Sequence, residues 1–137
     1  MLKTGAILNF MLAIGHVLCL FRLDVVFRLY RIDPIMDRLA SCWPPIPYLM
    51  TLGVACGLAG CGFYALSAAG TIRPLPLLRP IVYAIGGLFL LRALVGFIAM
   101  GSSGSYPITE LSAAVVAGVV GTLYLAGGIR TFNHTRA

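Results

Sequence analysis

Charged residues are scarce in this chain. Of its 137 residues, 10% are charged, 60% are hydrophobic and only four are acidic. Because charged residues make up about 25% of an ordinary soluble domain, this composition excludes a soluble globular protein. No basic tract with interleaved aromatic residues indicates nucleic-acid binding either. We expect a protein embedded in the lipid bilayer, whose net charge of +6 lies at the membrane flanks.

Catalytic and metal-binding patterns are missing as well. The four cysteines, Cys19, Cys42, Cys56 and Cys61, form no CxxC pair and have no zinc-site spacing to a histidine. No HExxH motif, GxSxG motif or paired-acid motif is present. We therefore predict no metal and no cofactor, and favour a non-enzymatic protein. The sequence leaves the question of a disulfide between Cys19 and Cys42 open, because both cysteines fall at the same membrane face and would bond if that face is oxidising.

Four apolar runs are long enough to cross a bilayer, which takes about 20 residues each. They cover residues 5–21, 48–69, 81–100 and 108–128. The turns between the later runs are short, so we predict one all-α membrane domain over residues 1–137, an up-down bundle of four transmembrane helices. The first run has no convincing cleavage site, and we expect it to stay as a helix. Residues 22–40 mix charges with bulky apolar residues, which predicts an amphipathic interfacial segment broken near Pro34.

The distribution of basic residues indicates the orientation. The positive-inside rule counts basic residues near the ends of the spans. Four of them lie in the first loop, namely Arg22, Arg28, Arg31 and Arg38. Five lie on the side of the two termini, namely Lys3, Arg73, Arg79, Arg130 and Arg136. The excess of five basic residues over four favours a topology with both termini in the cytoplasm.

Small residues follow one face of two of the spans. At about 100° per residue they form one stripe on each helix. The stripes consist of Gly53, Gly57, Gly60 and Ser67 in the second span, and of Ala114, Ala117 and Gly121 in the fourth. Small side chains let helices approach closely, so we expect both stripes to pack helices together. Four short helices offer little interior volume, which favours a homo-oligomer or a larger membrane complex.

An amide residue, Asn9, and three residues that can carry a charge, His16, Arg92 and Glu110, lie inside the spans. An arginine near the bilayer centre costs about 2.5–3.5 kcal/mol on insertion scales, so something must compensate for Arg92. At 1.5 Å per residue, Arg92 lies ~12 Å, His16 ~8 Å and Glu110 ~4 Å inside the ends of their spans. All three fall in the membrane half next to the first loop, and we expect Arg92 to reach Glu110.

This polar cluster has several interpretations. In the structural one, Arg92 pairs with Glu110, while His16 and Asn9 donate interhelical hydrogen bonds. The chain is then a non-enzymatic membrane module, either an accessory subunit or a self-associating unit. In the alternative, it is a small carrier or channel in which Arg92 binds an anionic solute or lipid headgroup and His16 with Glu110 gates or relays protons. A membrane enzyme acting on a lipid or isoprenoid substrate is the third class.

The central part of the chain resembles a sequence pattern found in other membrane proteins. The segment Phe63 to Arg79, FYALSAAGTIRPLPLLR, followed by Leu90-Leu91-Arg92-Ala93-Leu94, resembles a pattern in small uncharacterised four-helix proteins of the bacterial inner membrane. The resemblance covers roughly the central quarter of the chain. It implies a bacterial origin and a four-helix unit, and it implies no activity. Of the polar cluster, only Arg92 belongs to the resembling segment.

Overall fold

The computed structural model describes residues 1–133, and over that range all regular structure is helical. Four helical segments are long and apolar enough to cross a membrane. The predicted all-α fold with four membrane-crossing helices is thereby confirmed. Arg136, which the orientation count includes, lies outside the described residues. The elements are α1 (Leu2–Cys19), η1 (Leu20–Arg22), α2 (Leu23–Leu29), α3 (Asp33–Cys42), α4 (Ile46–Ala68), α5 (Leu78–Ser103) and α6 (Ile108–Asn133).

The later helices are longer than the apolar runs that predict them. Helix α5 has 26 residues, because it begins at Leu78 instead of Ile81 and continues to Ser103 instead of ending at Met100. Its end is set by Gly104, which adopts the left-handed conformation with φ of 63° that commonly terminates helices. At 1.5 Å per residue α5 is ~39 Å long, enough to cross the hydrocarbon core and both of its boundaries.

The first loop folds into the two short helices α2 and α3, as its amphipathic pattern predicts. The chain reverses between them at Tyr30–Ile32, where Arg31 has a φ of 56°. Pro34 then occupies the first turn of α3, a position where a missing backbone N–H costs nothing. Cys19 and Cys42, at the ends of α1 and α3, are both free, so the structure contains no disulfide between them.

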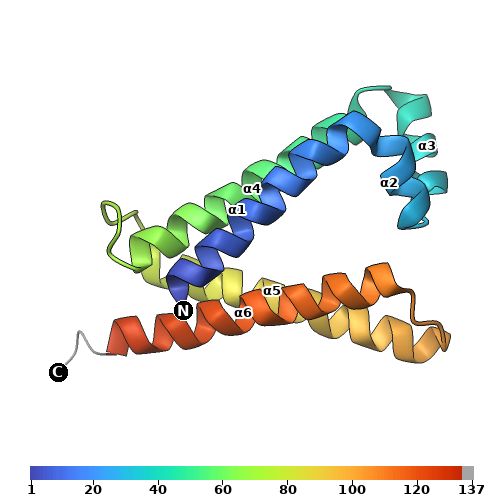
Figure 1. Ribbon diagram of the computed structural model, residues 1–137. Coiled ribbons are helices and arrows are strands. Elements are labelled where there is room, and N and C mark those ends of the chain that lie inside the picture. Colours follow the sequence, from blue (N-terminus) through green and yellow to red (C-terminus); the bar gives the residue numbers. More distant parts are fainter. Residues whose placement is uncertain (134–137) are drawn as a thin grey trace.

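The four long helices form two antiparallel hairpins rather than one evenly packed bundle. Helix α1 packs along α4, and α5 packs along α6, while contacts between the two hairpins are fewer. Figure 1 shows that the hairpins meet at the end that carries the N-terminus and diverge toward the end that carries α2 and α3. We call the closed end the vertex and the open end the mouth.

Glycines and alanines bring α5 and α6 into close contact. Ala114 and Ala117 are buried on α6, where Ala114 faces Gly96 of α5. A Cβ on Gly121 would lie 2.9 Å from the backbone oxygen of Gly86 and 2.9 Å from the backbone nitrogen of Leu90. The α6 stripe therefore lies in the α5–α6 contact.

The stripe on α4 lies elsewhere, and its predicted role in helix packing stays a prediction. Among residues 1–133, nothing lies within 4 Å of a Cβ placed on Gly53, Gly57 or Gly60, so these glycines are not used in a contact between helices of this chain. Helix α4 contacts α1 through its opposite side, where Gly62 fits against the ring of Phe10. The fourth member, Ser67, is buried for another reason, because its hydroxyl donates to the carbonyl of Arg73 and accepts from the backbone N–H of Leu75. It fixes the turn between the hairpins.

Candidate functional site

The diverging hairpins enclose a cavity of about 500 Å³, which we call the inter-hairpin cleft. Cavities of this size hold small-molecule ligands in other proteins, where the usual range is about 300–1,000 Å³. The cleft is lined by side chains from all four long helices and by Tyr30, in the turn between α2 and α3. They are Leu12, His16, Tyr30, Val54, Leu58, Phe89, Arg92, Ser112, Ala113, Val116 and Ala117.

Arg92 is the only charged residue in this lining. Its Cα lies ~21 Å from the start and ~16 Å from the end of α5, at 1.5 Å per residue, and thus near the middle of this membrane-spanning helix. Its Nη2 donates to Oε2 of Glu110 at 3.2 Å, which joins α5 to the first turn of α6. The guanidinium leans toward the mouth, because a Cβ on Gly96, one turn further along α5, would lie 2.9 Å from Nη1.

The ion pair does not satisfy Arg92. A guanidinium has five N–H donors, and the bond to Glu110 is the only hydrogen bond that Arg92 makes within residues 1–133. The side chains remain 48% and 37% exposed. A pair this open contributes up to about 1 kcal/mol. That is less than the ~2.5–3.5 kcal/mol cost of an arginine in mid-membrane. The remaining donors therefore require other acceptors, supplied by water or by an anion in the inter-hairpin cleft.

His16 faces the same cleft from the opposite hairpin. Its Nδ1 lies 2.8 Å from the carbonyl oxygen of Leu12. Because a carbonyl only accepts, Nδ1 carries the proton and Nε2 is left as the free ring nitrogen. Tyr30, in the turn between α2 and α3, lines both the inter-hairpin cleft and a smaller apolar cavity of about 300 Å³ beside these two helices. His16, Tyr30 and Arg92 thus line the same cleft from different elements.

Asn9 does not join this group. It is fully buried at the vertex, where its Nδ2 donates to the hydroxyl of Tyr124 at 2.7 Å and more weakly to the carbonyl of Gly5 at 3.3 Å. The Tyr124 hydroxyl in turn donates to the carbonyl of Cys61 at 2.7 Å. This chain of hydrogen bonds connects α1, α6 and α4. Of the four predicted polar residues, the structure brings Arg92, Glu110 and His16 to one end and leaves Asn9 to tie the hairpins together.

Sequence reasoning did not identify several important residues. Tyr124 continues the α6 stripe at the 3.6-residue period, so extending the stripe would have found it. Gly96 follows Arg92 by one helical turn, which places it on the same face. Ser112 and Tyr30 gave no signal, because an exposed serine and an interfacial tyrosine are ordinary in membrane proteins.

Within the described part of the chain, no group of three or more His, Cys, Asp or Glu residues is placed to hold a metal ion. Comparisons with protein-family models, with curated proteins and with solved structures find no match for this chain. The geometry of the inter-hairpin cleft therefore carries the functional argument.

Proposed function

We propose that this chain is a multi-pass membrane module that binds an anionic group, a phosphate or a carboxylate, through Arg92 in the inter-hairpin cleft. The observation that carries the proposal is the state of Arg92. It stands in the middle of an apolar helix, lines a cavity of about 500 Å³, and makes one hydrogen bond with the described residues. An anion in the cleft would accept from the unused guanidinium donors, and such charge-assisted bonds are about twice as strong as neutral ones.

The neighbouring groups fit the same role. The free Nε2 of His16 accepts a hydrogen bond from a protonated phosphate oxygen when neutral, and donates one when charged. Ser112 adds a further polar side chain to the lining, where its hydroxyl donates to the carbonyl oxygen of Thr109 at 2.9 Å and keeps its lone pairs as acceptors. Glu110 acts as the internal competitor, because its carboxylate occupies one side of the guanidinium until the ligand arrives. In this proposal the Arg92–Glu110 ion pair forms when the binding site holds no ligand.

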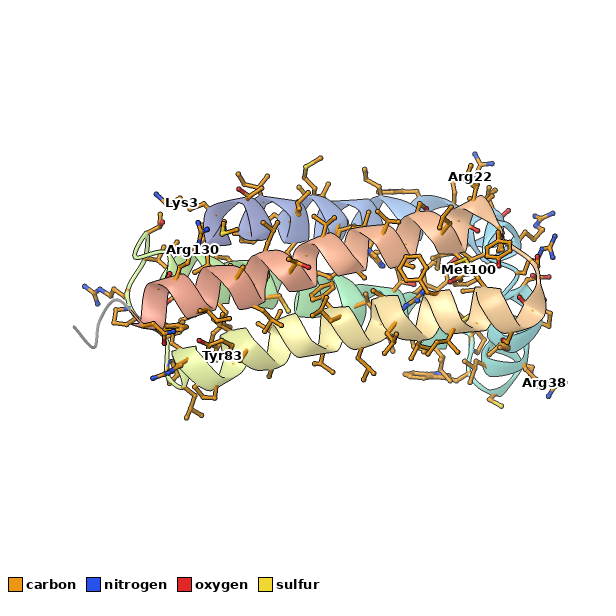
Figure 2. The ribbon with its side chains drawn as sticks, turned by 90° about the horizontal axis from the view of Figure 1, so that it is seen from below. Lys3, Arg22, Arg38, Tyr83, Met100 and Arg130 are labelled. Carbon is orange, nitrogen blue, oxygen red and sulfur yellow. The ribbon has the colours of Figure 1, made fainter. Side chains whose placement is uncertain are left out.

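The location follows from the charge distribution and the resemblance. Figure 2 shows Lys3 and Arg130 at one end of the molecule and Arg22 and Arg38 at the other. We propose that the end with Lys3 and Arg130 lies in the cytoplasm of a bacterial cell, as the positive-inside rule favours, with the chain in the inner membrane. The mouth of the inter-hairpin cleft then faces the opposite leaflet.

Glu110→Gln tests this proposal, because a competing carboxylate and a structural one predict opposite changes in ligand affinity. We expect the variant to bind butyl phosphate about fivefold more tightly, because removing a half-exposed competing carboxylate is worth up to about 1 kcal/mol. Binding is measured on purified protein in non-ionic detergent, from the ³¹P line broadening of the ligand at constant ionic strength.

Asp24→Asn is the matched control. Asp24 forms an ion pair with Arg28 at the same distance of 3.2 Å, but this pair lies on α2 at the surface. Its removal should leave the affinity unchanged. Weaker binding, or no binding, by Glu110→Gln would show that Glu110 locks the helices and does not compete with a ligand.

A second function is favoured by the α4 stripe. Gly53, Gly57 and Gly60 lie on the side of α4 that faces away from α1, with open space beside each of them. Small residues on a lipid-facing surface allow another helix to approach closely. We propose that this face packs against a second copy of the chain or a larger membrane complex.

Gly57→Leu should weaken self-association, because the added side chain holds a second helix away. The measurement is the dimer fraction by energy transfer between donor- and acceptor-labelled chains in vesicles. Gly87→Leu is the control, since Gly87 also borders open space but lies on α5, in the other hairpin. An equal dimer fraction in both variants would rule out the α4 face as the contact.

A further inference from the structure

The arrangement of the cleft lining points to a particular class of ligand. We propose that the occupant is an anionic amphiphile, a lipid of the leaflet on the mouth side, with its headgroup at Arg92 and its hydrocarbon in the vertex half of the inter-hairpin cleft. This inference rests on the proposed anion site and adds the substrate class.

The residues that line the cleft are ordered by depth. On three helices a polar residue lies nearer the mouth and an apolar residue lies nearer the vertex. On α1, His16 lies four residues nearer the mouth than Leu12, and on α5, Arg92 lies three residues nearer than Phe89. On α6, Ser112 lies four residues nearer the mouth than Val116. At 1.5 Å per residue each polar group is ~4.5–6 Å closer to the membrane surface than its apolar neighbour. A lipid in that leaflet has the same order, with its headgroup outermost.

The vertex closes the apolar half of the cleft. Phe89, at its inner limit, stacks on Tyr124 with ring centroids 6.4 Å apart. Tyr124, Asn9, Val120 and Ala6 are all fully buried there. A soluble ion that crosses the membrane needs an open polar path to the other side. The vertex is packed shut instead, since its polar side chains, Asn9 and Tyr124, are fully buried and hydrogen-bonded to each other. The shape therefore favours a ligand that enters from one side and keeps an apolar part inside.

The sides of the cleft remain accessible. Val54 of α4 and Val116 of α6 line it from the two hairpins, yet they are 49% and 36% exposed. In a bilayer these gaps open toward lipid chains. A lipid can therefore enter sideways, without taking its hydrocarbon through water.

The experiment places a fluorescent reporter in the apolar half of the cleft. Leu58→Trp supplies it in a Trp43→Phe background, because Trp43 is the only tryptophan of the chain. The protein is reconstituted in vesicles of fixed phosphatidylcholine and phosphatidylglycerol content, with brominated chains on one lipid or the other. We expect quenching to report an enrichment of phosphatidylglycerol of about fivefold, the preference that one arginine gives for an anionic headgroup.

Two controls and a second reporter accompany this measurement. Adding Arg92→Met should abolish the preference. A reporter at Leu94→Trp should show none, because Leu94 is 56% exposed on the outside of α5. If Leu58→Trp fails to fold, Val116→Trp on the facing hairpin replaces it.

Equal quenching by both brominated lipids would overturn the proposal that the ligand is an anionic amphiphile. If butyl phosphate still binds and its binding depends on Arg92, the cleft takes a soluble anion and the proposed function survives. If neither the lipid preference nor the binding of butyl phosphate is observed, both proposals are overturned.

Discussion

Arg92→Met is expected to weaken the binding of butyl phosphate by about 10- to 100-fold, because hydrogen bonds to charged groups contribute about 1.5–3 kcal/mol. Methionine keeps much of the length of the side chain and fits an apolar membrane helix. It removes the guanidinium from a position where no other residue can replace it, since Arg92 is the only charged residue in the lining of the inter-hairpin cleft. The fold should persist, because the Arg92–Glu110 pair is half exposed and contributes little to packing.

Two further variants complete this experiment. Arg92→Lys keeps the charge but loses the planar fork that binds two oxygens at once, so we expect its affinity to fall as well. Arg38→Met removes an exposed arginine at the same end of the molecule and should leave the affinity unchanged. If Arg92→Met instead unfolds the protein or leaves the affinity unaltered, Arg92 is a structural residue and the cleft is not its binding site.

Gly121→Ala is expected to destabilise the chain by about 1–3 kcal/mol, the usual cost of overpacking a close contact. The added Cβ would lie 2.8 Å from Cγ of Leu90 and 2.9 Å from two backbone atoms of α5. A leucine side chain can rotate, but the backbone of Gly86 and Leu90 cannot move without shifting α5 away from α6. The free energy of unfolding, measured by titration from mild to denaturing detergent, gives the effect.

Gly118→Ala is the matched control on the same helix. Its Cβ would lie 3.7 Å from that of Ala93, an ordinary van der Waals distance. This variant should be neutral or slightly more stable, because alanine favours a helix over glycine by up to about 1 kcal/mol. Equal stabilities of the two variants would contradict the close approach of α5 and α6 at Gly121.

Much of the fold could be predicted from the sequence because hydrocarbon imposes simple rules. Apolar runs of membrane length give the helices, since a backbone in lipid must satisfy its own hydrogen bonds. The approach of Arg92 to Glu110 follows from depth, because a tight turn places α5 and α6 side by side. The extension of α5 to Ser103 was missed, because it depends on the conformation of Gly104 and not on hydropathy.

The divergence of the hairpins could not be predicted. Periodicity shows which residues share a face of one helix, but not which helix that face meets. The glycines of α4 and the small residues of α6 form similar stripes, yet one borders open space and the other lies against α5. Likewise Asn9 and His16 share a face of α1, while the splay of the hairpins buries one at the vertex and leaves the other in the cleft.

The central claim is that Arg92 lies in a cleft that is accessible to anions. Ser112→Cys in a chain without its four native cysteines tests this directly, because Ser112 lines the cleft opposite His16. Its reaction rates with anionic sulfonatoethyl and cationic trimethylammonioethyl methanethiosulfonate are compared with those of Ser102→Cys, an exposed site at the end of α5. We predict a higher anionic-to-cationic ratio at Ser112→Cys, which Arg92→Met abolishes. A cysteine at position 112 that reacts with neither reagent, or shows the same ratio with and without Arg92, would contradict the account.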